Sequence, residues 1–194
     1  MNGQEEKAAI RREMRLRRKA VGERARQSAA QAICAALLAR RDVQRAIRSA
    51  APIAVYLASP AEIDLSPFVK AVLTLGGRLV APRWNGKSYD LAALTGLTDA
   101  SLCRGPMNIL EPRPEVPRCA SDEVGLWLVP GLAFTLDGAR LGYGGGWYDR
   151  LLADVADETP RLGIAYDFQV VAELPTDAHD IRLTDIVHVG EGAS

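Results

Sequence analysis

The sequence lacks any apolar run near the roughly 20 residues that a membrane-spanning helix needs, and its N-terminus has no apolar signal core. A mitochondrial presequence is also excluded, because such segments are poor in acids, whereas Glu5, Glu6, Glu13 and Glu23 lie near the start of this chain. These absences predict a cytoplasmic protein that has no membrane partner.

Cysteine and histidine are scarce. The chain has three widely spaced cysteines (Cys34, Cys103 and Cys119), and its two histidines (His179 and His188) have no partner at zinc-ligand spacing. This predicts reduced, buried thiols and no zinc site. A complete P-loop motif and a Gly-x-Ser-x-Gly motif are also absent, which disfavours a P-loop nucleotidase and a covalent hydrolase.

The chain has 194 residues, of which 48% are hydrophobic and 25% charged, as in one globular domain over 1–194. Its formal net charge of zero hides an asymmetry, because residues 1–48 carry thirteen Lys and Arg against five Asp and Glu. Such a basic segment is typical of a nucleic-acid or lipid surface, of a solvated helical face on an acidic body, or of a site for a small anion.

The hydrophobic pattern predicts two helices, over 4–20 and 23–40, in a basic N-terminal part (1–48), followed by an α/β body over 51–190. Strands are predicted at Ile53–Leu57, Arg78–Pro82, Leu126–Val129, Arg161–Tyr166 and Asp185–Val189. Further helices are predicted from an N-cap at Ser66 to Gly76-Gly77, over 147–155, and as one turn at Gln169–Leu174. This alternation predicts a three-layer α/β/α sandwich around a mostly parallel sheet, with ligands at the carboxyl ends of the strands.

The segment from Arg140 through Gly142–Gly146 into the helix over 147–155 is rich in glycine. Glycines let backbone N–H groups crowd around one point, and a helix N-terminus adds positive partial charge, so the segment is typical either of a phosphate site or of a tight turn. A dinucleotide fingerprint fails, because Trp147 stands at its third glycine. Arg140, with Asp149 and Asp180 as candidate ligands of a hard cation, favours phosphate plus a metal ion.

Phe134–Leu152, with Arg140-Leu-Gly-Tyr-Gly-Gly-Gly-Trp-Tyr-Asp-Arg150, resembles the signature of the 5-formyltetrahydrofolate cyclo-ligase, or methenyltetrahydrofolate synthetase, family. Other blocks agree with that family in order along most of the chain. They are Lys7 with Arg11, Tyr56 with Glu62-Ile-Asp64, Ile109–Pro112, Gly163–Gln169, Leu174-Pro175 and His179-Asp180.

The resemblance implies an ATP-dependent, Mg²⁺-requiring conversion of 5-formyltetrahydrofolate to 5,10-methenyltetrahydrofolate, with release of ADP and phosphate. It also implies the fold grouped with ribose-5-phosphate isomerase and CoA transferases. The expected partners are these small molecules and not nucleic acid. We expect a monomer, because no heptad repeat or large apolar stripe is evident.

The resemblance also implies roles for individual residues. The implied ATP-binding residues are Lys7, Arg11, Arg140, Gly142, Tyr143, Gly144, Gly145, Gly146, Trp147 and Tyr148. The implied folate contacts are Ser59, Glu62, Asp64, Tyr143, Gly144, Gly145, Gly146 and Trp147. Arg140, Asp64 and Tyr148 are the implied catalytic residues, and Asp149 and Asp180 are the implied Mg²⁺ ligands.

The chain departs from the family pattern at three positions, which are Leu65, Thr135 and Trp147. Three rival interpretations are a sugar-phosphate isomerase or acyl-CoA transferase on the same scaffold, a nucleic-acid-binding protein that uses the basic segment, and a diverged paralogue that keeps the ATP site but uses another formylated substrate. The first needs no ATP, and the second predicts steeply salt-dependent binding and leaves the glycine-rich segment unexplained. The third fits the sequence better than either of the other two.

Overall fold

The computed structural model describes residues 3–106, 108–177 and 180–190. Its α-helices are α1 (Gly3–Ala20), α2 (Glu23–Ala39), α3 (Arg41–Ser49), α4 (Ser66–Thr74) and α5 (Trp147–Leu152). The strands of the main sheet are β1 (Ile53–Ala54), β2 (Leu79–Trp84), β3 (Tyr89–Ala93), β6 (Arg118–Cys119), β7 (Leu126–Val129), β10 (Arg161–Tyr166) and β11 (Asp185–Val189). Two short hairpins are formed by β4 (Leu102–Arg104) with β5 (Leu110–Pro112), and by β8 (Ala133–Phe134) with β9 (Arg140–Leu141).

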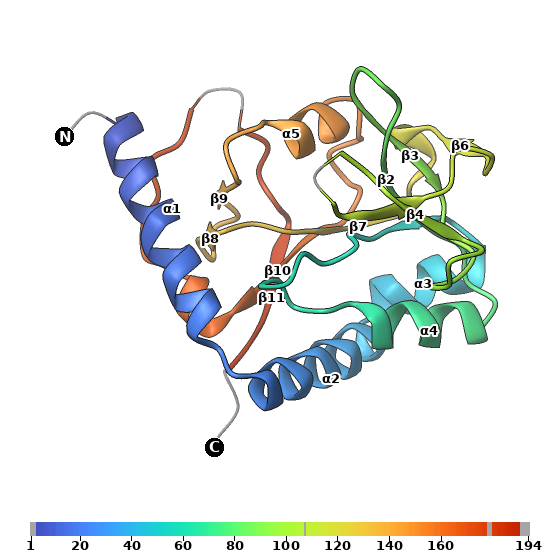
Figure 1. The fold of residues 1–194 in the computed structure, drawn as a ribbon, viewed down its shortest axis with the longest axis horizontal. Helices are drawn as coiled ribbons and strands as arrows, with labels where there is room; N and C mark the ends of the chain where they lie inside the picture. Colours follow the sequence, from blue (N-terminus) through green and yellow to red (C-terminus); the bar gives the residue numbers. More distant parts are fainter. Residues whose placement is uncertain (1–2, 107, 178–179, 191–194) are drawn as a thin grey trace.

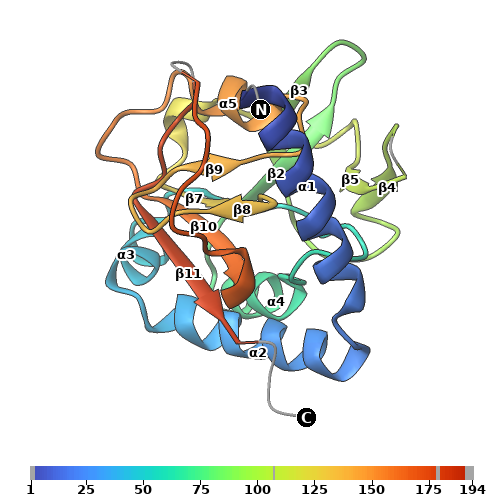
Figure 2. The same ribbon diagram turned by 90° about the vertical axis from the view of Figure 1, so that its left-hand side faces the viewer.

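The central sheet has the order β11-β10-β7-β1-β2-β3-β6, in which neighbours are parallel from β11 to β2 and antiparallel beyond. Helices α2, α3 and α4 cover one face and α5 covers the other, while α1 packs against the β8–β9 hairpin, beyond the carboxyl ends of the parallel strands (Figures 1 and 2). The prediction of an α/β fold with a mostly parallel sheet is confirmed.

The parallel strands are apolar because helices cover both of their faces. All four residues of β7 and all six of β10 are buried. The larger core lies between the sheet and α2 to α4, and the smaller core lies between the sheet and α5. Helix α1 packs separately, with Met14 against the β8–β9 hairpin.

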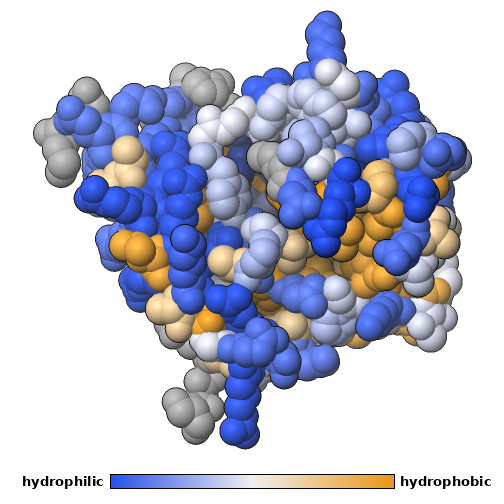
Figure 3. All heavy atoms as spheres, viewed as in Figure 1, coloured by the Kyte–Doolittle hydropathy of each residue, from blue (hydrophilic) through white to orange (hydrophobic). Residues whose placement is uncertain are grey.

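Hydrophilic side chains cover the edge of the molecule where α1 stands, and hydrophobic ones gather in the right half of the same view (Figure 3). Within the described part of the chain, no helix has both the length and the apolar character needed to cross a bilayer. All three cysteines are free; Cys34 is buried, whereas Cys103 and Cys119 are only partly buried, contrary to the expectation that all three lie in the interior.

Several predicted elements differ in the structure. The strand expected over Ile53–Leu57 is only the two residues of β1, and the turn expected at Gln169–Leu174 is instead a 3₁₀ turn over Asp167–Gln169. Helix α4 begins at Ser66 itself, because the preceding Leu65 is the cap residue. Helix α3 was not predicted as a separate element.

The break between α2 and α3 falls at Arg40, whose backbone is extended (φ −74°, ψ 136°). Its guanidinium donates to the Asp42 carboxylate and reaches Asp185 on β11 at 2.7 Å. The Asp42 carboxylate also accepts a hydrogen bond from the backbone N–H of Val43. These contacts of Arg40 with Asp42 and Asp185, called the Arg40 clamp below, therefore separate two helices in a segment whose apolar residues continue at helical spacing.

The triplet Gly86-Lys87-Ser88 shares its sequence with the end of a P-loop motif but not its structure. It lies in the turn between β2 and β3, where the backbone N–H of Asn85 donates to the carbonyl oxygen of Ser88. This is a hairpin between antiparallel strands, with no helix following it. It therefore does not form a phosphate-binding P-loop.

Candidate active site

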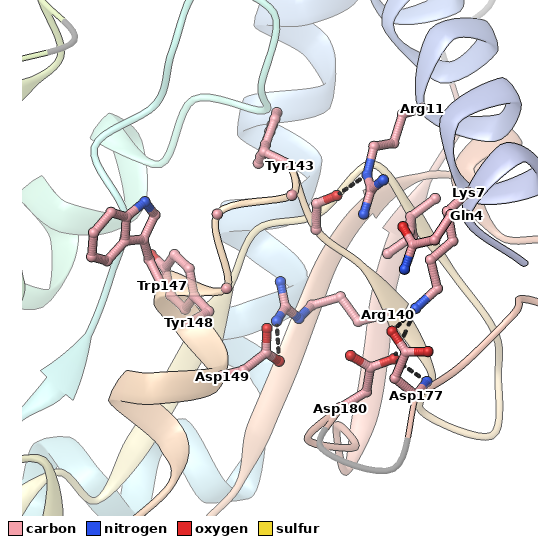
Figure 4. Close-up of a pocket in the computed structure, with 15 residues that line it drawn as sticks. Gln4, Lys7, Arg11, Arg140, Tyr143, Trp147, Tyr148, Asp149, Asp177 and Asp180 are labelled. Atoms are coloured by element: carbon pink, nitrogen blue, oxygen red, sulfur yellow. Dashed lines mark hydrogen bonds and ion pairs between the residues drawn. The ribbon is translucent and has the colours of Figure 1, made fainter.

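A pocket of about 280 Å³ lies between α1 and the segment that joins β9 to α5 (Figure 4). Its lining contains every residue predicted to bind ATP and both predicted metal ligands, together with three further residues. The full lining is Gln4, Lys7, Arg11, Arg140, Leu141, Gly142, Tyr143, Gly144, Gly145, Gly146, Trp147, Tyr148, Asp149, Asp177 and Asp180. The segments that form it follow β7 and β10, so it lies on the carboxyl side of the parallel strands, where a ligand site was predicted.

The glycine-rich loop, Gly142–Gly146, passes from β9 into the first turn of α5. Gly144 and Gly146 have positive φ angles, of 106° and 63°, which side chains other than glycine rarely adopt. A Cβ atom added at Gly145 would lie 2.6 Å from the indole nitrogen of Trp147. The glycines therefore allow a tight path that brings the backbone to the pocket.

Three cations line the pocket. Lys7 and Arg11 project from α1, one helical turn apart, and Arg140 projects from β9. The Nε of Arg11 donates to the carbonyl oxygen of Gly142 at 3.0 Å, which ties α1 to the glycine-rich loop. The side chain of Arg140 is only 5% exposed, and its Nε has no hydrogen-bond partner in the described part of the chain.

Three carboxylates face these cations. Arg140 donates to Asp149 at 2.7 Å, and Lys7 lies 2.8 Å from Asp177 and 3.4 Å from Asp180. Figure 4 shows Asp149 on one side of Arg140, and Asp177 and Asp180 with Lys7 on the other. Burial alone lowers the pKa of Lys7, but the contacts with both aspartates outweigh it and raise the pKa, so the ammonium stays charged.

The two predicted metal ligands, Asp149 and Asp180, line the same pocket on opposite sides of Arg140 (Figure 4). In the ranges 3–106, 108–177 and 180–190, no group of three or more His, Cys, Asp or Glu side chains is arranged to hold a metal ion unaided. Mg²⁺ at nucleotide sites ordinarily takes only one or two carboxylates and is completed by phosphates and water. This donor set therefore fits a metal ion that arrives with a nucleotide.

Arg18 connects α1 with two loops. Its guanidinium is nearly buried and donates to the carbonyl oxygen of Ala61 at 2.7 Å, to that of Gly131 at 3.4 Å, and to the Tyr143 hydroxyl at 2.5 Å. The same hydroxyl donates to the Glu62 carboxylate. Burial, followed by the nearby charge of Glu62, raises the pKa of Tyr143, so its phenol stays protonated and remains a donor.

The predicted folate contacts that follow β1 do not line the pocket, and of these described residues only Glu62 touches a residue that does. Glu62 reaches the glycine-rich loop through Tyr143, and its other oxygen accepts from the backbone N–H of Ser59 at 2.8 Å. Asp64 is exposed, and its Oδ1 accepts from the backbone N–H and the hydroxyl of Ser66 at the start of α4. Leu65, one of the departures from the family pattern, is 2% exposed and packs in the core.

Aromatic rings border the far end of the pocket. Trp147 packs edge-on against Trp84 and Tyr89, with ring centroids 5.5 Å and 5.3 Å away. The Arg150 guanidinium lies 4.2 Å from the Trp147 ring centroid. Burial, and then the charge of Glu62, raise the pKa of Tyr148 well above its ordinary value, so this phenol also stays protonated.

Sequence reasoning missed Gln4, Arg18 and Asp177. Asp177 lies three residues before the predicted ligand Asp180, and Arg18 lies two turns beyond Arg11 on the same helix. These spacings are the only signals in the sequence, because the contacts themselves join positions far apart in the chain. His179 lies outside the described residues.

Comparison with known proteins agrees with the geometry. The sequence profile described as the 5-formyltetrahydrofolate cyclo-ligase family matches residues 3–189. The 5-formyltetrahydrofolate cyclo-ligase of Escherichia coli K12 is 31% identical over 138 residues, which is 70% of this chain and 76% of that protein. The mouse enzyme of the same name is 28% identical over 190 residues, which is 93% of this chain and 91% of the mouse protein.

A solved structure also resembles this fold. The NMR structure of Aquifex aeolicus 5,10-methenyltetrahydrofolate synthetase superposes with a TM-score of 0.81 at 32% sequence identity, covering 94% of this chain and 89% of that one. The comparison thus extends from α1 through the C-terminal strand.

Proposed function

The chain belongs to the 5-formyltetrahydrofolate cyclo-ligase family, whose members convert 5-formyltetrahydrofolate to 5,10-methenyltetrahydrofolate at the expense of ATP, and we propose that its pocket transfers the terminal phosphoryl group of ATP to the formyl oxygen. N10 of the folate then attacks the activated carbon and loses its proton to solvent, and the bond from carbon to the phosphorylated oxygen breaks as phosphate leaves. The cations around the glycine-rich loop, above all Arg140 with its unpartnered Nε, are the observation that carries this proposal.

Phosphorylation is needed because a formamide is a poor electrophile. Its nitrogen donates into the carbonyl, and the rotation barrier of about 18–20 kcal/mol in a peptide amide indicates how strong that resonance is. Transfer of a phosphoryl group to the formyl oxygen converts it into a good leaving group. The ring closure that follows joins two atoms already held in one molecule.

Phosphoryl transfer requires positioning and charge neutralisation more than covalent help from the protein. Lys7, Arg11 and Arg140 neutralise the phosphates in this proposal, and Arg140 presents a planar, forked donor to them. The backbone of Gly142–Gly146 approaches the same phosphates, because no side chain stands in the way. Trp147 and Tyr148 border the nucleotide where the loop enters α5.

Asp149 and Asp180 would hold Mg²⁺ together with the ATP phosphates, because both line the pocket and both carry hard oxygen donors. When bound, the ion supplies positive charge that draws electrons from the transferring phosphoryl group. The Mg²⁺ requirement is therefore part of the proposal.

The folate lies on the side of Ser59, Glu62 and Asp64 in this proposal, and shares the glycine-rich loop and Trp147 with the nucleotide. Tyr148 stays protonated, so it acts there as a hydrogen-bond donor and not as a base. Asp64 offers a carboxylate that stabilises the positive charge developing on the methenyl product. We also propose that the protein is a cytoplasmic monomer and that it binds no nucleic acid.

The test incubates the purified protein with 5-formyltetrahydrofolate, Mg²⁺ and ATP, and follows the absorbance of the methenyl product. We expect turnover that stops when ATP is omitted, and a large loss in Arg140→Met. Arg45→Met is the matched control, because Arg45 is exposed on α3 and does not line the pocket. Product formation without ATP would instead favour the isomerase or transferase interpretation.

A further inference from the structure

The cations assigned to phosphate binding already have partners within the protein. Lys7 is held by Asp177 and Asp180, and Arg140 by Asp149. Lys7 is deeply placed, with a side chain that is 7% exposed, whereas that of Asp177 is 42% exposed. A phosphate group that binds Lys7 therefore meets an ammonium whose charge two carboxylates already balance.

Among the residues that the structure describes, the charges that line the pocket balance. Lys7, Arg11 and Arg140 give three positive charges, and Asp149, Asp177 and Asp180 give three negative ones. A polyphosphate without a metal ion gains nothing from the net charge of this pocket and is repelled by its carboxylates. A divalent cation gives Asp149 and Asp180 a replacement partner, which releases Arg140 and leaves Lys7 with Asp177 alone.

Asp177 differs from the other two carboxylates. It makes the shorter contact with Lys7, at 2.8 Å, and it is not one of the predicted metal ligands. Its backbone N–H donates to the Asp180 carboxylate at 2.7 Å, so the two aspartates and Lys7 form one connected group. Asp177 therefore competes with phosphate for Lys7 and is coupled through its backbone to a predicted metal ligand.

Building on the proposed function, we propose that Asp177 is a positioning residue that withholds Lys7 from a metal-free nucleotide and so makes the site select the metal-complexed form. Binding of phosphate and of the metal ion is then mutually dependent, and by linkage each strengthens the other by the same factor. Removing the Asp177 charge weakens this dependence by strengthening the binding of metal-free nucleotide.

The experiment measures binding of a non-hydrolysable ATP analogue, adenylyl imidodiphosphate, by calorimetry, once in excess chelator and once in excess Mg²⁺. We expect Asp177→Asn to bind the metal-free analogue about ten-fold more tightly than the unmodified protein, within the usual range of site–site coupling. In excess Mg²⁺ we expect the two affinities to agree within about three-fold. The metal ion then draws the Asp180 carboxylate away from the backbone N–H of Asp177, which shifts Asp177 and releases its hold on Lys7.

Three further variants identify the cause. Asp177→Glu keeps the charge and should behave as the unmodified protein. Asp157→Asn removes the same charge from a side chain that is 99% exposed and should also change nothing. Adding Lys7→Met to Asp177→Asn should abolish the gain, because Asp177 acts through Lys7.

The central readout is a gain in affinity, which a damaged structure does not produce. The proposal is overturned if Asp177→Asn binds the metal-free analogue no more tightly than the unmodified protein, or if the gain survives Lys7→Met. If the unmodified protein binds the analogue in neither condition, the proposed function fails instead.

Discussion

Replacing Arg18 by methionine should destabilise the protein far more than the same change at a neighbouring position. The guanidinium satisfies the carbonyl oxygens of Ala61 and Gly131 and the hydroxyl of Tyr143, in surroundings that leave Arg18 only 4% exposed. Methionine keeps the apolar stem and the helix propensity but donates to none of these atoms.

The magnitude follows from the three contacts. A hydrogen bond from a charged donor contributes about 1.5–3 kcal/mol, and leaving a buried acceptor unsatisfied costs about 1–3 kcal/mol. The contact with Gly131 is long, at 3.4 Å, so the bonds to Ala61 and Tyr143 dominate. After allowing for the desolvation of the arginine itself, we expect a loss of about 3 kcal/mol in the free energy of unfolding. For a chain of this size, that lowers the melting temperature by about 6–12 °C.

Arg17→Met is the matched control, one residue away on the same helix. Its side chain is 47% exposed, lies 3.8 Å from Glu13, and stacks 4.6 Å from the Phe168 ring centroid. Such contacts contribute about 0.5–1 kcal/mol. Urea denaturation of the two variants measures the difference, and losses equal within about 0.5 kcal/mol would refute the assignment of Arg18 as the link between α1 and the two loops.

Two other changes test separate parts of the structure. Asp64→Asn should lower turnover at least about ten-fold without changing the KM for ATP. Ser66→Ala is its control, because it removes only a partner of the Asp64 carboxylate and should have a smaller effect on turnover. Unchanged turnover and folate affinity in Asp64→Asn would contradict a catalytic role for Asp64. Burial raises the pKa of Asp42, but the hydrogen bonds from Arg40 and Val43 outweigh it and lower the pKa below its ordinary value. The Asp42 contribution to stability is therefore complete above about pH 4 and lost as the pH falls through the lowered pKa. Urea denaturation between neutral pH and about pH 3 should show a smaller acid-induced loss in Asp42→Asn, and an equal loss would contradict the clamp.

The elements with strong hydrophobic patterns were predictable from the sequence. Strands β7 and β10 could be predicted from their continuous apolar runs, and helix α2 from the spacing of its apolar residues. In these segments the burial of apolar side chains decides the local structure. The antiparallel strands β3 and β6 were missed; β6 has only two residues and forms the edge of the sheet, and β3 lies next to it. The separation of α2 from α3 depends on the Arg40 clamp, which apolar spacing does not reveal.

The candidate site was only partly predictable, for a related reason. Arg140 and the glycine-rich loop form one continuous segment, so their proximity is given by the chain itself. Lys7 and Asp177 meet across 170 positions of sequence, and Arg18 and Tyr143 meet across 125. Such contacts follow from the packing of α1 against the β8–β9 hairpin, which one sequence does not specify.

The placement of the tryptophans provides an intrinsic fluorescent reporter. Of the three indoles, Trp127 is fully buried in the core, whereas Trp84 and Trp147 touch each other and Trp147 also lines the pocket. A ligand that enters the pocket changes the surroundings of one emitter directly and of its neighbour by contact, while the third supplies a constant background. Titrations of this protein can therefore be followed by its own emission, without an attached dye.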